Sequence, residues 1–178
     1  MADRNLKRTP LHQMHVELGA KMVAYAGFEM PVTYPAGITA EHKAVREGVG
    51  VFDVSHMGEF EVTGPDRNAF VQRVTCNDVG ALKPGQAQYS AILTSQGTFV
   101  DDCLVYRFED KLMLVVNAAN LKKDWDQIVS QKGGANVRLR DISDETALIA
   151  VQGPKAEALL APLTTLGVAM IPYYHFAH

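Results

Sequence analysis

The alternation of apolar and polar residues in the middle of the chain predicts a β-hairpin. Residues 89–93 combine aromatic, β-branched and aliphatic side chains, residues 94–97 form the turn cluster Thr-Ser-Gln-Gly, and residues 98–108 form a second apolar run. Two acids, Asp101 and Asp102, interrupt this second run. The second strand is therefore expected to be largely buried and to carry its chemistry on these two side chains.

The two acids are expected to face opposite sides of the strand, because strand side chains alternate in direction. The same alternation places Asp102, Leu104 and Tyr106 on one face. An ionised carboxylate among apolar neighbours is costly unless a partner compensates its charge. One acid is thus expected to face a ligand. The alternative is that each acid caps a turn or meets a solvated edge of the sheet.

The rest of the sequence alternates between helical and strand-like patterns. Helices are predicted over 9–18, 38–47, 64–74, 118–131 and 153–160, and strands over 21–26, 59–63, 111–117, 137–142 and 147–152. Thr9 and Thr39 are the expected N-caps of the first two helices. The prolines and glycines within 27–37 predict irregular structure there. The inward face of the 118–131 helix is expected to comprise Leu121, Trp125, Ile128 and Val129.

Two segments, 59–74 and 147–160, share the order strand, Gly-Pro, helix, which indicates a weak internal duplication. Helices mixed with hairpins indicate an α+β fold in which antiparallel sheets have helices packed on one face. We expect residues 1–178 to be the amino-terminal part of a domain, with a possible hairpin-rich subdivision near 52–140. Residues 171–178 resemble the start of a strand whose partner is missing, which suggests a truncated chain.

Composition and charge narrow the function classes. The chain is 47% hydrophobic and 21% charged, as is usual for globular proteins, and a net charge of -3 without a basic stripe argues against nucleic acid as a partner. Cys76 and Cys103 are too few and too far apart for a disulfide framework or a zinc site, which favours a cytoplasmic protein. No apolar run approaches the about 20 residues that span a bilayer, so no membrane is expected as a partner.

Histidines and a serine offer further candidates for chemistry. His12 and His15 share a helix face without a third ligand nearby, which favours structural roles over metal binding. Asp53 and His56 could each be catalytic. A nucleophilic pair of Ser55 and His56 is unfavourable, because neighbouring strand side chains point apart. His56 is more simply explained as a hydrogen-bonded core histidine.

Several motifs together resemble the aminomethyltransferase (T-protein) family of the glycine cleavage system. They are Phe-Asp-Val-Ser-His-Met-Gly at 52–58, Tyr-Ser at 89–90, Asp-Asp-Cys-Leu-Val-Tyr at 101–106, Val-Val-Asn-Ala-Ala-Asn at 115–120 and Val-Gln-Gly-Pro at 151–154. Thr-Pro-Leu at 9–11 and Ala-Gly-Phe-Glu-Met-Pro at 26–31 fit the same family. Each motif is weak alone, but their order spans nearly the whole chain. The resemblance covers only the amino-terminal half of the family, and its carboxy-terminal domain is absent.

The resemblance implies a T-protein-like folate-binding fold and a tetrahydrofolate-dependent activity. The family moves a methylene group from an aminomethyl-lipoyl arm on a carrier protein, the H-protein, to tetrahydrofolate and releases ammonia, without a metal. Asp102 would be catalytic, lying beside the folate nitrogens and stabilising positive charge in an iminium-like intermediate. Tyr89 and Tyr106 would line the folate slot, Asn117 would add a hydrogen bond, and Met57 would supply apolar contact.

Other interpretations remain open at this stage. Tyr89 and Tyr106 could be ordinary sheet aromatics, and Asp101 is expected to bind backbone groups rather than a ligand. The chain could be a folate-binding module related to sarcosine or dimethylglycine dehydrogenases, although its start at Met1 leaves no room for a preceding flavin domain. It could also be a non-enzymatic relative involved in iron–sulfur assembly, an alternative that Asp101, Asp102 and Tyr89 disfavour. As given, the chain is expected to be inactive and to self-associate.

Overall fold

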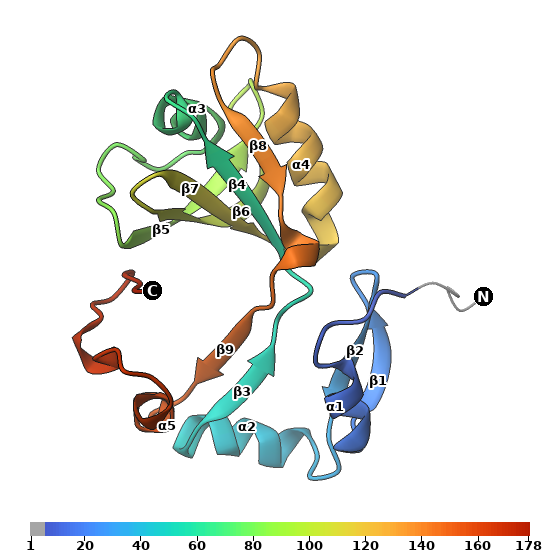
Figure 1. The fold of residues 1–178 in the computed structure, drawn as a ribbon. Helices are drawn as coiled ribbons and strands as arrows, with labels where there is room; N and C mark the ends of the chain where they lie inside the picture. The colour runs from blue at the N-terminus through green and yellow to red at the C-terminus, as the bar shows by residue number, and fades with distance from the viewer. Residues whose placement is uncertain (1–5) are drawn as a thin grey trace. The chain divides into compact units, whose positions relative to one another are not determined.

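The computed structural model describes residues 6–178 and divides into two compact units (Figure 1). The first unit combines the chain up to His56 with Ala147–Met170, and the second combines Met57–Thr146 with Ile171–His178. Each unit therefore contains segments that are far apart in the sequence.

The second unit is built on a five-stranded antiparallel sheet. Its strand order is β5-β6-β7-β4-β8. The strands are β4 (Gly58–Thr63), β5 (Gln86–Leu93), β6 (Phe99–Arg107), β7 (Lys111–Val116) and β8 (Arg138–Asp141). The β5–β6 pair is the predicted hairpin, with its turn at 94–97. The mixed α+β fold with antiparallel strands is confirmed.

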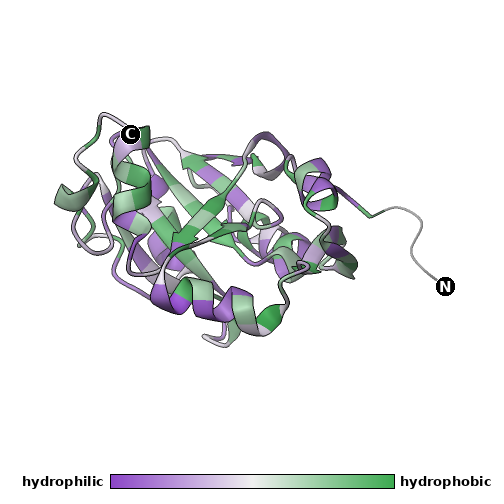
Figure 2. Ribbon diagram, turned by 90° about the horizontal axis from the view of Figure 1, so that it is seen from below, coloured by the Kyte–Doolittle hydropathy of each residue, from purple (hydrophilic) through white to green (hydrophobic). Residues whose placement is uncertain are grey.

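Two helices, α3 (Arg67–Val74) and α4 (Leu121–Ser130), pack on one face of this sheet. Alternate strand residues and the inward residues of both helices form one hydrophobic core, which includes Phe60, Val62, Phe70, Val71, Val74, Cys103, Val105, Leu112, Leu114, Val116 and Ile128. Figure 2 shows bands of hydrophobic residues beside hydrophilic ones on helices and strands, as expected for elements with one buried face. Leu121 and Trp125 pack against this core as predicted, but Val129 is 42% exposed, so its predicted inward position is wrong.

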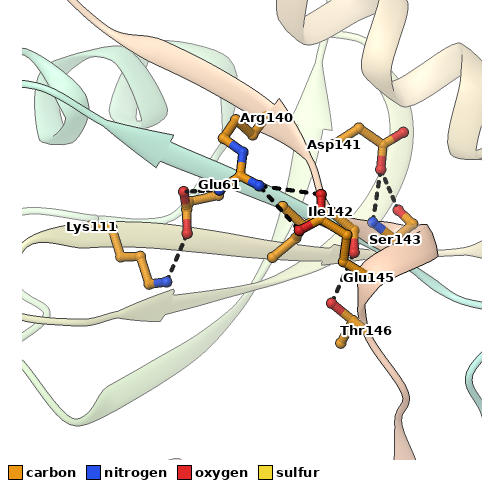
Figure 3. Close-up of polar contacts among 8 residues, drawn as sticks. All are labelled: Glu61, Lys111, Arg140, Asp141, Ile142, Ser143, Glu145 and Thr146. Atoms are coloured by element: carbon orange, nitrogen blue, oxygen red, sulfur yellow. Dashed lines mark hydrogen bonds and ion pairs between the residues drawn. The ribbon is translucent and has the colours of Figure 1, made fainter.

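Side chains as well as backbone attach β8 to the sheet (Figure 3). The Lys111 ammonium donates to Glu61 at 2.7 Å, and Arg140 pairs with Glu61 at 3.5 Å and with Glu145 at 3.1 Å. Beyond β8, the Ile142 N–H donates to the Glu59 carbonyl, and the Ser143 hydroxyl accepts a hydrogen bond from the Glu59 N–H. The short helix η2 (Ser143–Glu145) therefore follows β8 directly beside β4.

Within its described residues, the first unit contains two two-stranded antiparallel sheets and three α-helices. One sheet pairs β1 (Lys21–Tyr25) with β2 (Phe28–Thr33), and the other pairs β3 (Gly50–Asp53) with β9 (Ile149–Gln152). The α-helices are α1 (His12–Glu17), α2 (Ile38–Glu47) and α5 (Ala156–Leu160), and two short 3₁₀ helices follow α5, namely η3 (Ala161–Leu163) and η4 (Val168–Met170). A further 3₁₀ helix, η1 (Ala118–Asn120), belongs to the second unit and precedes α4. Within 6–178, no helix has the length and apolar character that a bilayer crossing requires.

Several predicted boundaries are wrong. Residues 28–33 form β2 although Pro31 lies among them, because β2 has a single partner strand and a proline is tolerated at such an edge. Helix α1 begins at His12 with Leu11 as its N-cap, and α2 follows Gly37 at φ 84°, so neither Thr9 nor Thr39 is a cap. Helix α3 begins at Arg67, after a turn at 64–66.

The two Gly-Pro turns have the same local geometry. Gly64 has φ 107° and Gly153 has φ 122°, values that favour glycine. A Cβ at Gly64 would lie 2.5 Å from the Asn136 carbonyl oxygen, and one at Gly153 would lie 2.5 Å from the Gly48 carbonyl oxygen. Each turn needs glycine because of its positive φ and because a backbone carbonyl oxygen leaves no room for a Cβ. This explains why a glycine stands before the proline in both segments.

The segment 171–178 is not the partnerless strand that the sequence predicts. The Ala87 N–H donates to the Tyr174 carbonyl, the Phe176 N–H donates to the Gly85 carbonyl, and Gln86 and His175 form an isolated antiparallel bridge. Tyr174 has φ 54°, which interrupts extended backbone. The segment therefore covers part of the free edge of β5 without becoming a strand.

Candidate functional site

The Asp102 carboxylate accepts hydrogen bonds from two side chains in the second unit. The Tyr89 hydroxyl donates at 2.6 Å, and the Asn117 amide donates to Oδ1 at 2.7 Å. Tyr89 pairs with Leu104 and Ala91 pairs with Asp102 in the β5–β6 register, so Tyr89 and Asp102 are diagonal neighbours on one face. Asn117 follows β7 directly. The predicted site residues Tyr89, Asp102 and Asn117 are thus brought together by hairpin register and strand order.

These hydrogen bonds set the ionisation of the site. The hydrogen bond from Tyr89 is the largest effect on Asp102; burial opposes it, and the bond from Asn117 adds to it, so that the pKa of Asp102 is lowered. The same contact with Asp102 raises the pKa of the Tyr89 hydroxyl. At neutral pH the site therefore presents a carboxylate and a protonated phenol. Tyr89 is 56% exposed, so the site is open to solvent within this unit.

Asp101 lies on the opposite face of β6, as the alternation predicts. Cys103 and Val105, which share its face, are buried against the helices. Its expected role of binding backbone groups is not what the structure shows, because its carboxylate accepts from the Asn117 amide at 3.2 Å and contacts Asp124 of α4. Asn117 lies at the end of β7, where one amide reaches both acids.

Tyr106 and Met57 complete the predicted set. Tyr106 is half-buried on the Asp102 face, and its ring packs against Phe176 with centroids 5.5 Å apart. Burial raises the pKa of its hydroxyl, with a further contribution from Tyr174. Gly58 pairs with Val116, so Met57 lies at the same end of the sheet as Asn117. Tyr106 therefore shares a face of β6 with Asp102, and Met57 lies at the end of the sheet where Asn117 follows β7.

Sequence reasoning missed Tyr174. This residue lies close enough to Tyr89 and Tyr106 to raise the pKa values of both hydroxyls, although other effects are larger at each. The consecutive pair Tyr173 and Tyr174 was a visible signal, but it was interpreted only as the start of a strand. Its positive φ and its attachment to β5 depend on tertiary contacts and could not be deduced from the pattern.

The other catalytic candidates, Asp53 and His56, have structural partners within the first unit. His15 Nε2 lies 3.0 Å from Asp53, and His15 Nδ1 lies 2.8 Å from the Tyr34 hydroxyl. Burial would raise the pKa of Asp53, but hydrogen bonds from His15 and from the Ser55 N–H lower it. These contacts connect α1, β2 and β3 of the first unit.

Ser55 and His56 lie in a turn after β3 and not on the strand that the sequence predicts, and their side chains contact different partners. The Ser55 hydroxyl donates to the Leu148 carbonyl at 3.2 Å. The His56 ring packs edge-on against Tyr25, and burial lowers the pKa of His56. Its Nδ1 is buried without a hydrogen-bond partner among residues 6–178, so the expected hydrogen-bonded core histidine is only partly right. His12 is engaged by Glu29 at 2.8 Å.

Comparisons with known proteins agree with the sequence motifs. The GCVT N-terminal domain model matches residues 11–178. The chain is 55% identical to the aminomethyltransferase of Chloroherpeton thalassium over 172 residues and 51% identical to that of Bacteroides thetaiotaomicron. Each match covers 96% of this chain and 47% of the relative.

A solved structure shows the same fold. The glycine cleavage system aminomethyltransferase T from Bartonella henselae superposes with a TM-score of 0.89 at 36% identity, covering 96% of this chain and 46% of that protein. The chain thus spans about half the length of the relatives it matches. Motif order, strand topology and these similarities converge, and the chain belongs to the aminomethyltransferase family as its GCVT amino-terminal domain.

Proposed function

We propose that this chain supplies the catalytic carboxylate and part of the folate site of a tetrahydrofolate-dependent aminomethyltransferase of glycine cleavage. The observation that carries the proposal is the ionised Asp102, held between the Tyr89 hydroxyl and the Asn117 amide on a solvent-accessible sheet face. The reaction would move a methylene group from an aminomethyl-lipoyl arm to tetrahydrofolate and release ammonia.

The role of Asp102 follows from its charge and its partners. An anionic oxygen can accept a hydrogen bond from an attacking amine and can stabilise positive charge that develops on nitrogen. Two donors restrict the carboxylate to one orientation, so little reorganisation is needed when that charge appears. Tyr89 therefore acts twice, as a donor to Asp102 and as a flat surface beside it.

The remaining residues are proposed to shape the folate slot. The Tyr89 and Tyr106 rings offer flat apolar surfaces with polar hydroxyls, which suit a planar heteroaromatic ring. Met57 adds an adaptable apolar side chain at the Asn117 end. Asn117 keeps its amide on the two acids and thereby positions Asp102. None of these roles requires a metal.

The proposed partners are tetrahydrofolate and a lipoyl carrier protein, the H-protein of the glycine cleavage system. Support comes from the similarity to the glycine cleavage system aminomethyltransferase T of Bartonella henselae. We also propose a cytoplasmic location, which suits two free cysteines, one of them exposed.

Substitution of Asp102 in the full-length protein tests the proposal. Asp102→Asn keeps the shape of the side chain but removes its charge, and it should lower kcat by at least about 100-fold, the order expected for a positioned acid–base or charge-stabilising group. Turnover should be followed as methylene transfer from an aminomethylated carrier protein. Asp126→Asn, at an exposed pair with Lys122 on α4, is the control. Near-equal rates of the wild type and Asp102→Asn would rule out the proposed role.

A further inference from the structure

Asp124 is a buried acid with no conventional partner, directly behind the candidate site. It lies on the same face of α4 as Leu121 and Ile128, and the residue has no solvent exposure. Neither of its carboxyl oxygens accepts a hydrogen bond from any donor group within residues 6–178. Buried charges are normally paired, so this carboxyl needs an explanation.

The contact that Asp124 does make is with another acid, Asp101 on β6. Two carboxylates in hydrogen-bonding contact repel each other, and they attract only when one proton lies between them. Burial, and then the neighbouring Asp101, raise the pKa of Asp124 to about 7. Complete burial of Asp124 beside Asp101, without a donor to either of its oxygens among residues 6–178, therefore favours a carboxylic acid that donates to the Asp101 carboxylate.

The charged and titratable groups around Asp124 do not supply a competing counterion. Lys123 favours the ionised form, but its ammonium donates to the Val100 carbonyl at 2.8 Å. Asp102 raises the pKa of Asp124 further. Cys103 faces the same core with its thiol kept protonated, because burial raises its pKa to about 12. No set of side chains within 6–178, including these acids, has the arrangement that holds a metal ion.

Asp101 connects this acid to the site through a shared amide. Asn117 Nδ2 donates to Asp101 at 3.2 Å and to Asp102 at 2.7 Å. Hydrogen bonds thus link Asp101 through Asn117 to Asp102 and Tyr89, and Asp124 contacts Asp101 at the other end of this series. Of these five residues, Asp102 and Tyr89 lie on the proposed folate face of the sheet.

We propose that Asp124 is a positioning residue whose protonated carboxyl group donates to Asp101 and thereby fixes the Asn117 amide that orients Asp102. A neutral Asp124 limits the pair behind the sheet to one negative charge, so that Asn117 can donate to both acids. Loss of the Asp124 proton would place two repelling carboxylates there and would loosen the amide. The importance of Asp102 rests on the proposed function, but the shared proton does not.

Titration of the 178-residue chain tests the shared proton without any turnover. With ¹³C-carboxyl labelling of aspartate only, one aspartate signal should titrate near pH 7 in the wild type and in the control Asp126→Asn. Aspartate labelling excludes Glu59, whose pKa is also raised to about 7. The signal should be absent from Asp124→Asn. Titration of every aspartate below about pH 5 would overturn the inference, since that is the range of unpaired carboxyls.

Activity of the full-length protein tests positioning. Asp124→Asn should keep most of kcat, because its amide donates to Asp101 at every pH. The wild-type rate is expected to fall as the pH rises through about 7, and Asp124→Asn should lack this fall. Asp124→Leu removes the donor and should lower kcat about 10-fold with KM nearly unchanged, by analogy with outer-shell partners of other sites.

The possible failures are distinguishable. Identical pH profiles for the wild type and Asp124→Asn would overturn the positioning role even if Asp102→Asn is inactive. Full activity of Asp102→Asn would overturn the proposed function while leaving the aspartate titration intact. If Asp124→Leu does not fold, the pH profile of Asp124→Asn and the titration still decide the inference.

Discussion

At the scale of single residues, Tyr89 combines two roles that substitution can separate. Tyr89→Ala removes the ring and should weaken tetrahydrofolate binding to the full-length protein by about 1–3 kcal/mol, by analogy with base–aromatic stacking. Tyr89→Phe keeps the ring and removes only the hydrogen bond to Asp102, so it should bind nearly as tightly but react more slowly. Calorimetry and steady-state rates measure the two effects.

The control for this pair of variants is Phe99→Ala, which removes another exposed aromatic side chain, at the first residue of β6 and away from Leu104, which pairs with Tyr89. It should leave folate affinity unchanged. Unchanged affinity of Tyr89→Ala would instead make Tyr89 an ordinary sheet aromatic, the alternative that the sequence leaves open.

The buried acid Glu59 is expected to make the free energy of unfolding depend on pH. It is 1% exposed, its two oxygens have no hydrogen-bond partner within 6–178, and burial, followed by the charge of Asp141, raises its pKa from 4.5 to about 7. Between these pH values the folded chain holds a proton that the unfolded chain has released. Stability should therefore fall as the pH rises from 4.5 to about 7 and then level off.

Glu59→Gln should remove this share of the pH dependence. Because the glutamine carries no charge, the variant should be more stable than the wild type at pH 8, by at most about 3 kcal/mol. Urea unfolding at pH 5 and pH 8 measures the difference. Asp124 contributes in the same direction, so Asp124→Asn serves as a parallel measurement. Equal pH dependence in the wild type and Glu59→Gln would show that Glu59 ionises normally in the folded chain.

At the scale of elements, residues 171–178 act as a cover for the β5 edge. They hydrogen-bond to Gly85 and Ala87, and Phe176 packs against Tyr106 and Phe108. A chain truncated after Met170 would leave these backbone groups and rings exposed, and a free strand edge promotes pairing between molecules. We predict that this truncation increases self-association in sedimentation velocity. A truncated chain that sediments like the intact one would show that the segment does not protect the edge.

At the scale of the whole molecule, the chain spans about half the length of its relatives, and we expect this to limit its activity. Two-stranded sheets are marginal by themselves, and among residues 6–178 both sheets of the first unit have two strands. Tyr89 is exposed, and a carboxylate beside bulk water interacts more weakly than one in an enclosed site. We predict negligible methylene transfer by the 178-residue chain alone, in contrast to a full-length protein. Turnover by a purified monomer of this chain would refute the prediction.

The sequence by itself determined the elements whose signals are local. The β5–β6 hairpin, α2 and β7 follow from apolar periodicity and turn residues, and the shared face of Asp102, Leu104 and Tyr106 follows from strand alternation. The motif order also indicated the family. These features depend on residues close together in the chain, so a pattern contains the information that specifies them.

Only the tertiary structure decided the features that join distant residues. The pairing of Asp124 with Asp101 requires α4 to pack on β6, and the proximity of Tyr174 to Tyr89 requires a late segment to attach to β5. Strand β2 forms despite Pro31 because β1 supplies its partner. In each case the free energy comes from burial and hydrogen bonds between separate elements, which local propensity does not encode.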